Sequence, residues 1–185
     1  KKMGMGVFCH EFSHCLGLPD VYDTNYGSTP TMGKWDLMAH GSYNGPEGIG
    51  WCPAPWTSYE RRFAGWLEPV EPQPGDTIRG VRSLCNGGTP YIIYNDGHKD
   101  EYFLLENHDG KGWDAYTPEK GLLVIHVDYD SVLFANNIVN STGSFTRDKG
   151  YDGDFTNDHA RMYPLSKIRS VNNETYYYTF PMEGK

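Results

Sequence analysis

Two histidines four residues apart, with a glutamate between them, form the segment of this sequence best suited to chemistry. The segment reads His10-Glu11-Phe12-Ser13-His14. Residues four apart on a helix face the same side, so both imidazoles can direct a nitrogen at one metal ion. Zinc suits such a site, because it binds imidazole nitrogens at about 2.0–2.1 Å. Glu11 would then lie beside the metal, where it can take a proton from water and pass it to a leaving group.

A carboxylate six residues beyond His14 completes the predicted ligand set. Gly17 lets the backbone turn sharply with a positive φ, and the turn returns Asp20 toward the metal. Two imidazoles and one carboxylate make a three-ligand zinc site whose fourth position stays open for water. We therefore expect His10, His14 and Asp20 to bind Zn²⁺ and Glu11 to act as the general base and acid.

The spacing H-E-x-x-H-x-x-G-x-x-D resembles the extended zinc signature of the metzincin proteases, with Asp20 in place of their usual third histidine. The segment 35–42 resembles the methionine turn of the same proteases, which implies that Met38 is an apolar floor beneath the zinc. His40 and Tyr43 follow that turn, and either is a candidate for stabilising the oxyanion of a tetrahedral intermediate.

The complete pattern is similar to the immune inhibitor A family of secreted metallopeptidases. The segments that carry the resemblance are 10–23, the Met38 turn, 65–67, 102–107, 121–128 and 136–140. The resemblance implies a zinc endopeptidase that cleaves proteins or peptides and is exported, with calcium as a further cofactor. Its location would be secreted or extracellular, with the periplasm or the cell surface as alternatives.

Other side chains offer weaker alternatives. Asp23, in the same predicted loop as Asp20, and Glu60, in the manner of thermolysin-like enzymes, are rival third ligands. An acidic cluster could bind calcium, although an acidic surface loop explains it better. Its members are Asp148, Asp152, Asp154, Asn157 and Asp158. The rival function is a non-catalytic, β-rich binding or structural fragment with a relic zinc site, against which the intact Glu11 argues.

Composition excludes several classes of protein. The 185 residues suffice for one domain, or for one domain with a small appendage. A formal net charge of -8 is the reverse of what nucleic-acid binding requires. The longest apolar runs fall far short of the ~20 residues that cross a bilayer. The four cysteines lack C-x-x-C spacing and are expected to be buried free thiols, with one or two disulfides as the alternative after export.

The predicted fold class is α+β: a metzincin-like lower catalytic subdomain, with the zinc helix, Met-turn and second helix, followed by a β-rich region of mostly antiparallel strands. We expect residues 1–68 to be the C-terminal part of a catalytic domain, 69–75 a Pro-rich connector, and 76–185 the β-rich region. Helices are predicted over 3–16 and 56–66, and long loops over 20–50 and 136–158. Strands are predicted over 77–84, 91–94, 102–106, 122–128 and 175–180, with turns at 86–88 and 95–97.

The first helix has an apolar stripe opposite its histidines, formed by Phe8, Phe12 and Leu16. We expect a further N-terminal segment of the same protein to cover this stripe, and the 185-residue chain to be weakly active or inactive alone. Of the remaining histidines, His126 lies in an apolar strand and is expected to be buried and hydrogen-bonded. The others are expected at the surface: His98, His108 and His159.

Overall fold

The computed structural model describes residues 3–165, 169–171, 174–176 and 179–180. Its α-helices are short: α1 (Gly6–His14), α2 (Ser58–Phe63) and α3 (Ser131–Ala135). Single 3-10 turns occupy Gly33–Trp35, His40–Tyr43, Pro46–Gly48, Leu84–Asn86, Gly112–Tyr116 and Arg147–Lys149. No helix in these ranges is long and apolar enough to cross a membrane.

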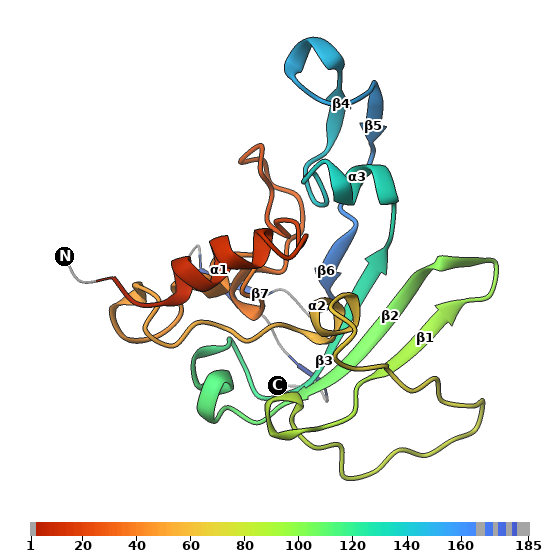
Figure 1. The fold of residues 1–185 in the computed structure, drawn as a ribbon. Coiled ribbons are helices and arrows are strands. Elements are labelled where there is room, and N and C mark those ends of the chain that lie inside the picture. Colours follow the sequence, from red (N-terminus) through yellow and green to blue (C-terminus); the bar gives the residue numbers. More distant parts are fainter. Residues whose placement is uncertain (1–2, 166–168, 172–173, 177–178, 181–185) are drawn as a thin grey trace.

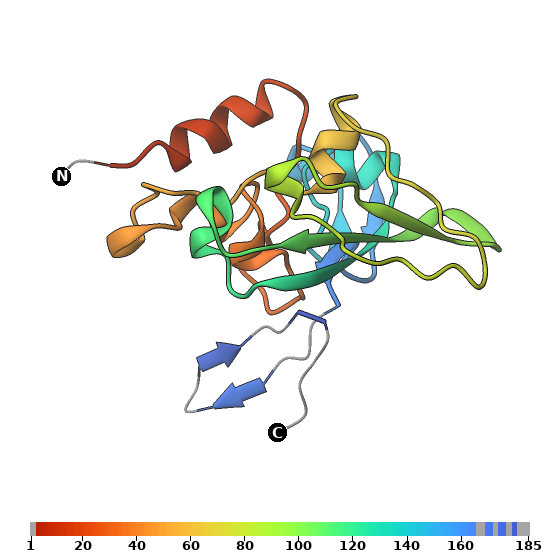
Figure 2. The same ribbon diagram turned by 90° about the horizontal axis from the view of Figure 1, so that it is seen from below.

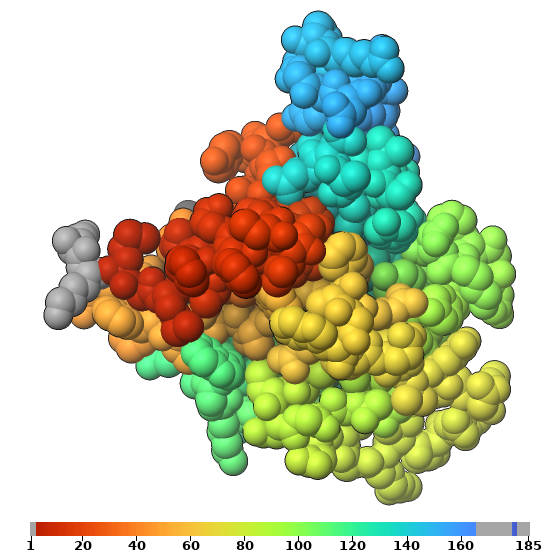
Figure 3. Space-filling view, in the orientation of Figure 1, coloured from red at the N-terminus to blue at the C-terminus, as the bar shows by residue number. Residues whose placement is uncertain are grey.

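An antiparallel sheet of four strands forms the body of the molecule (Figure 1). Its strands, in spatial order, are β1 (Tyr91–Asn95), β2 (His98–His108), β3 (Gly121–Asp128) and β6 (Met162–Pro164). Two further hairpins pair β4 (Gly143–Phe145) with β5 (Phe155–Asn157), and β7 (Arg169–Val171) with β8 (Glu174–Tyr176). The β4–β5 hairpin projects from the body (Figures 1 and 3).

The main core lies between the sheet and the segment that follows α1. Side chains alternate along β2, so that Tyr102 and Leu104 point inward toward residues of the N-terminal third. The cluster includes Leu18, Val21, Met32, Trp35 and Met38 from that third, and Ile92, Ile125, Val127 and Met162 from the sheet. Each fully buried aliphatic side chain contributes roughly 1.5–3 kcal/mol. This core contains residues from before and from after the predicted connector 69–75. The division into domains stays a prediction.

Helix α1 lies apart from the sheet and rests on the turn His40–Tyr43 (Figure 2). Gly6 makes the close approach feasible, because a Cβ there would overlap the carbonyl oxygen of Ser42. The apolar stripe faces away from the body: Phe8 is 72% exposed and Phe12 55% exposed. Figure 3 shows this helix at the surface. That a further segment of the protein covers the stripe remains a prediction.

The structure confirms the coarse class, α+β with a mostly antiparallel sheet, and corrects several elements. The strand predicted over 77–84 does not form, because Gly80 takes a φ of 64° and residues 77–80 are exposed on both faces. The loop predicted over 136–158 contains the β4–β5 hairpin. The last predicted strand is divided between β8 and an isolated bridge at Phe180, and residues 177–178 lie outside the described ranges.

Among the side chains, Cys15 and His108 differ from expectation. All four cysteines are free, but none is fully buried, and Cys15 is exposed. His108 was expected at the surface and is 1% exposed, with its ring between two carboxylates. Its Nε2 lies 2.8 Å from Glu106 and its Nδ1 lies 2.9 Å from Asp114. A cation between two buried carboxylates offsets the cost of burying them. His126 is buried and bonds Glu101, as expected.

This arrangement predicts a pH-dependent contribution to stability. Burial lowers the pKa of His108, but hydrogen bonds and charges from Asp114 and Glu106 raise it more, to about 9. Because the folded pKa exceeds the usual value of 6.5, the contribution is complete below pH 6.5 and is lost as the pH rises through 9. A rise of this size corresponds to about 3 kcal/mol. The advantage of the wild type over H108Q in free energy of unfolding should therefore shrink from pH 6 to pH 10.

Chemical unfolding at a series of pH values measures this advantage. The matched control is H159Q, because His159 is exposed and also contacts two carboxylates. If the free energy of unfolding of H108Q is below that of the wild type by the same amount at every pH, His108 is not the cation between Glu106 and Asp114.

Candidate metal centre and cleft

Helix α1 places His10 and His14 one above the other and ends directly after them. Gly17, at φ 90°, closes the helix: its N–H donates to the His14 carbonyl, and the Leu18 N–H donates to the Ser13 carbonyl. These two bonds form a Schellman motif, which needs a left-handed residue that glycine adopts without strain. The predicted positive φ at Gly17 is present. The chain then turns back along the helix toward the two imidazoles.

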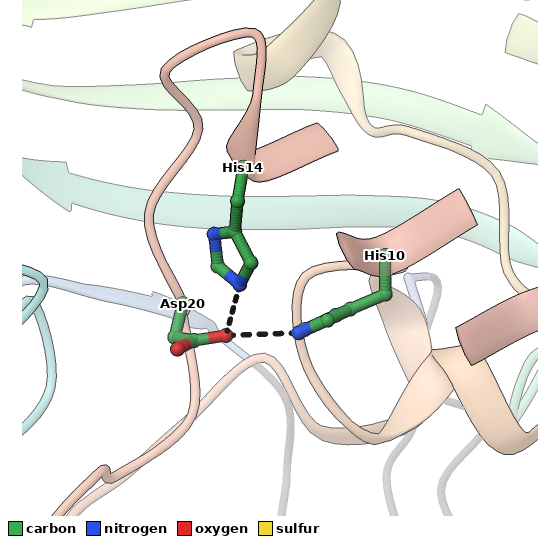
Figure 4. Close-up of side chains that lie close together, drawn as sticks. All are labelled: His10, His14 and Asp20. Atoms are coloured by element: carbon green, nitrogen blue, oxygen red, sulfur yellow. Dashed lines mark ion pairs between the residues drawn. The ribbon is translucent and has the colours of Figure 1, made fainter. Parts of the chain in front are cut away.

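The reversal brings Asp20 against both histidines (Figure 4). Its Oδ1 lies 3.1 Å from Nε2 of His10 and 3.3 Å from Nε2 of His14. The two imidazole rings meet edge to face, with their centroids 4.9 Å apart. Within the described residues, these three are the grouping of His, Cys, Asp and Glu whose ligand atoms lie close enough together to hold a metal ion.

The hydrogen bonds around the three side chains fit a cation. Nδ1 of His10 donates to the Leu37 carbonyl at 2.8 Å, and Nδ1 of His14 donates to the Leu18 carbonyl at 2.8 Å. With Nδ1 protonated, each neutral ring presents a lone pair at Nε2. While both imidazoles are neutral, Oδ1 of Asp20 is buried and has no hydrogen-bond donor. Three lone pairs that converge on one point repel one another unless a metal ion or a proton lies between them.

Asn137 binds the second oxygen of the Asp20 carboxylate, a contact that the sequence did not reveal. Its Nδ2 donates to Oδ2 of Asp20 at 2.7 Å, and its Oδ1 accepts the Asp20 N–H. Asn137 has a φ of 58°, a left-handed conformation that asparagine tolerates better than most residues. The only signal was its place in the segment 136–140. The contact leaves Oδ1 free to face the imidazoles.

The pKa values of this cluster follow from its contacts. Burial lowers the pKa of His10, but hydrogen bonds to Asp20 and Leu37 and the charge of Asp20 raise it above its ordinary value. Burial raises the pKa of Asp20, but the hydrogen bonds from His10 and Asn137 and the nearby imidazoles lower it below its ordinary value. A proton can thus occupy the position between these side chains when no metal does, and metal binding releases it.

A cleft of about 450 Å³ opens beside His10. Glu11 lines it from α1, and His40 and Tyr43 line it from the turn below. Tyr22, which the sequence did not single out, also lines it, and its ring lies 6.5 Å from that of His10. Burial, together with the charge of Asp20, raises the pKa of Tyr22 to about 12, so the phenol stays protonated at neutral pH.

Met38 is fully buried in the main core. Its carbonyl accepts the Val21 N–H at 2.9 Å, so the turn that carries Met38 runs beside the chain just after Asp20. The neighbouring Leu37 carbonyl orients His10. The turn therefore supports the histidine and the aspartate from one side.

The rival ligands Asp23 and Glu60 have hydrogen-bond donors of their own, although Asp23 lines the same cleft as His10. Oδ1 of Asp23 accepts bonds from Asn25 and Ser141, and its Oδ2 accepts one from Thr29. Glu60 is buried at the start of α2, where it accepts from Thr57. The acidic residues of the predicted calcium cluster are exposed: Asp148, Asp152, Asp154 and Asp158. The structure does not bring Asp23, Glu60 or this cluster into the group formed by His10, His14 and Asp20.

Comparison with known proteins identifies the segment that carries this geometry. Residues 1–66 match the immune inhibitor A peptidases, family M6, catalytic domain. The family resemblance in the sequence is thereby confirmed for this segment. It contains α1, the Met38 turn and α2.

Curated relatives match the chain over short stretches. The pre-pro-metalloprotease PrtV of Vibrio cholerae is 42% identical over 59 residues, which are 31% of this chain and 6% of that protein. Immune inhibitor A of Bacillus thuringiensis is 34% identical over 74 residues, 36% of this chain and 11% of that protein. A protein of Arthroderma benhamiae whose name includes "secreted metallopeptidase" is 46% identical over 51 residues, 26% of this chain and 7% of that protein.

The chain therefore spans about a tenth or less of the length of these relatives. No solved structure matches the chain significantly.

Proposed function

We propose that this chain carries the metal site of a zinc-dependent endopeptidase. The observation that supports the proposal most strongly is the convergence of Nε2 of His10, Nε2 of His14 and Oδ1 of Asp20 within hydrogen-bonding distance. These three atoms would hold the ion. Bound there, zinc would supply a Lewis acid and lower the pKa of a water molecule to roughly 7.

Glu11 is the residue that moves the proton in this proposal. It follows His10 on α1, lines the cleft, and is exposed to the water that must enter it. Its carboxylate would accept a proton from the attacking water and return it to the nitrogen of the leaving amine. Met38 would be the apolar floor, because the turn that carries it supports His10.

Hydrogen-bond donors on the other side of the cleft can stabilise the negative charge that develops on the carbonyl oxygen of the substrate. His40 and Tyr43 line it and carry a ring N–H and a phenol O–H, and the protonated phenol of Tyr22 lies beside the site. Such donors stabilise the oxyanion when they point at the position where charge develops. His40 and Tyr43 remain the candidates from the sequence, and the structure adds Tyr22.

The names of the relatives support a proposal for the substrates and the location of this activity. The name of one relative includes "metalloprotease", and the name of another includes "secreted metallopeptidase". We propose that the substrates are proteins or peptides and that the protein acts outside the cell. Calcium stays a prediction without support from the described residues.

Metal analysis of the purified chain tests the proposal. We expect about one zinc per chain, and its loss from a variant in which alanine replaces both His10 and His14. The control replaces the exposed His159 with alanine and should keep its zinc. Equal zinc in all three proteins would refute the proposed ligands. Zinc without peptidase activity in the full-length protein would favour the rival function, a binding or structural fragment with a relic site.

A further inference from the structure

Two buried carboxyl groups below the metal site have no cation beside them. Asp36 is 0% exposed and Glu60 is 1% exposed. A third buried carboxylate, Glu106, forms an ion pair with His108, but none of the ion pairs of the described residues includes Asp36 or Glu60. An isolated buried carboxylate is costly, and such groups become neutral instead. The two side chains therefore need a different form of compensation.

The hydrogen bonds of each group leave one oxygen unused. Oδ1 of Asp36 accepts the Met38 N–H at 2.7 Å, and Oε2 of Glu60 accepts the Thr57 N–H at 2.8 Å. Oδ2 of Asp36 and Oε1 of Glu60 are buried and receive no donor from any other group. A side-chain hydrogen bond between the two groups is among the causes that set both pKa values. Two ionised carboxylates cannot make that bond, because both are acceptors only.

We propose that Asp36 and Glu60 share one proton at neutral pH, and that this carboxyl pair ties the Met38 turn to the start of α2. The bond joins Oδ2 of Asp36 to Oε1 of Glu60. No other group of the described residues needs to move to form it, because each remaining oxygen already has its donor.

The surroundings of the pair favour one retained proton. Burial is the largest cause and raises the pKa of both groups, most strongly that of Asp36. The charge of Glu106, on β2, raises both pKa values further. His108 also lies on β2, but its positive charge is balanced by Glu106 and by Asp114. The Thr57 donors favour the charged form of Glu60, which makes Asp36 the residue that carries the proton more often.

The turn held by this pair contacts the proposed metal ligands. Leu37, between Asp36 and Met38, accepts the Nδ1–H of His10 at 2.8 Å. The Met38 carbonyl accepts the N–H of Val21, the residue after Asp20. Asp36 and Glu60 are therefore positioning residues that act on the site through backbone atoms. This part of the inference rests on the proposed zinc site, whereas the shared proton does not.

Amide substitutions distinguish a shared proton from two independent carboxyl groups. In D36N the amide oxygen can keep the Met38 N–H while the NH₂ donates to Glu60, and E60Q is the mirror case. Each single variant should therefore stay folded. In D36N/E60Q two NH₂ groups face each other and one must turn away from its backbone donor. We expect the double variant to have an unfolding equilibrium constant at least tenfold above the value that the two single effects predict together.

The pH dependence gives a second readout that a purely structural role would not change. The folded wild type retains one proton that the unfolded chain releases above about pH 5. Its stability must therefore fall with rising pH relative to either single variant. We expect its unfolding equilibrium constant, divided by that of D36N or E60Q, to rise about tenfold per pH unit above pH 5 until the folded pair ionises.

Denaturant unfolding of the full chain at several pH values, with zinc titration of each variant, tests both parts. Single variants should bind zinc as the wild type does, and the double variant should bind it at least tenfold more weakly. Parallel pH profiles for wild type and single variants, or additive effects in the double variant, would overturn the shared proton. Normal zinc affinity in a destabilised double variant would overturn the positioning role. A wild type that binds no zinc would refute the proposed function and leave the unfolding results to decide on the proton.

Discussion

Replacing Glu11 with glutamine is expected to remove most peptidase activity from the full-length protein while zinc stays bound. Glutamine has nearly the same shape but cannot accept a proton from water. General base catalysis contributes about 10²–10⁴-fold, so turnover should fall by at least that factor. Zinc should remain because the three atoms that converge on the site belong to His10, His14 and Asp20. The measurement is kcat against a peptide substrate, with zinc content determined on the same sample.

A matched control separates the proton transfer from the surroundings of the cleft. Tyr26 also lines the cleft but is 89% exposed, and Y26F leaves its charge and shape nearly unchanged. That variant should keep turnover within about threefold of the wild type, a change of less than 1 kcal/mol. Near-normal turnover in E11Q would mean that another group takes the proton.

Replacing Asp20 with alanine is expected to weaken zinc binding by more than 100-fold. The substitution removes the carboxylate oxygen that lies 3.1 Å and 3.3 Å from the two imidazole nitrogens. Loss of a group that only orients a ligand typically costs about 10–100-fold in metal affinity. N137A should therefore fall in that lower range, because Asn137 contacts Oδ2 of Asp20 and orients the carboxylate. Zinc titration against a competing chelator measures both constants.

The rival third ligands provide the controls for this series. Asp23 and Glu60 already have hydrogen-bond donors of their own, and the isosteric variants D23N and E60Q keep the shape of each side chain. Both should bind zinc nearly as well as the wild type. If D23N or E60Q lost zinc while D20A retained it, the third ligand would be that residue and the site would belong to a different pattern.

The local parts of the site follow from the sequence because they depend on short-range geometry. A spacing of four residues places His10 and His14 on one face of any α-helix. Gly17 ends that helix because its backbone reaches a φ of 90° without strain. Asn95, Asp96 and Gly97 close a hairpin between β1 and β2 for the same kind of reason. In each case the residues that decide the structure lie within a few positions of one another.

Contacts between distant segments decide the rest, and no local pattern encodes them. Asp20 lies against the imidazoles with one oxygen held by Asn137, which is 117 residues away. His108 occupies an alternating strand, but its burial depends on Asp114 and on Trp35, which packs against its ring. The proposed pair of Asp36 and Glu60 likewise arises where the Met38 turn meets α2. A carboxylate or imidazole is stable in water and also in the protein interior when it has a hydrogen-bond or ion-pair partner there. The partners that the fold brings to it therefore determine whether it is a metal ligand, a member of a buried ion pair or a surface charge.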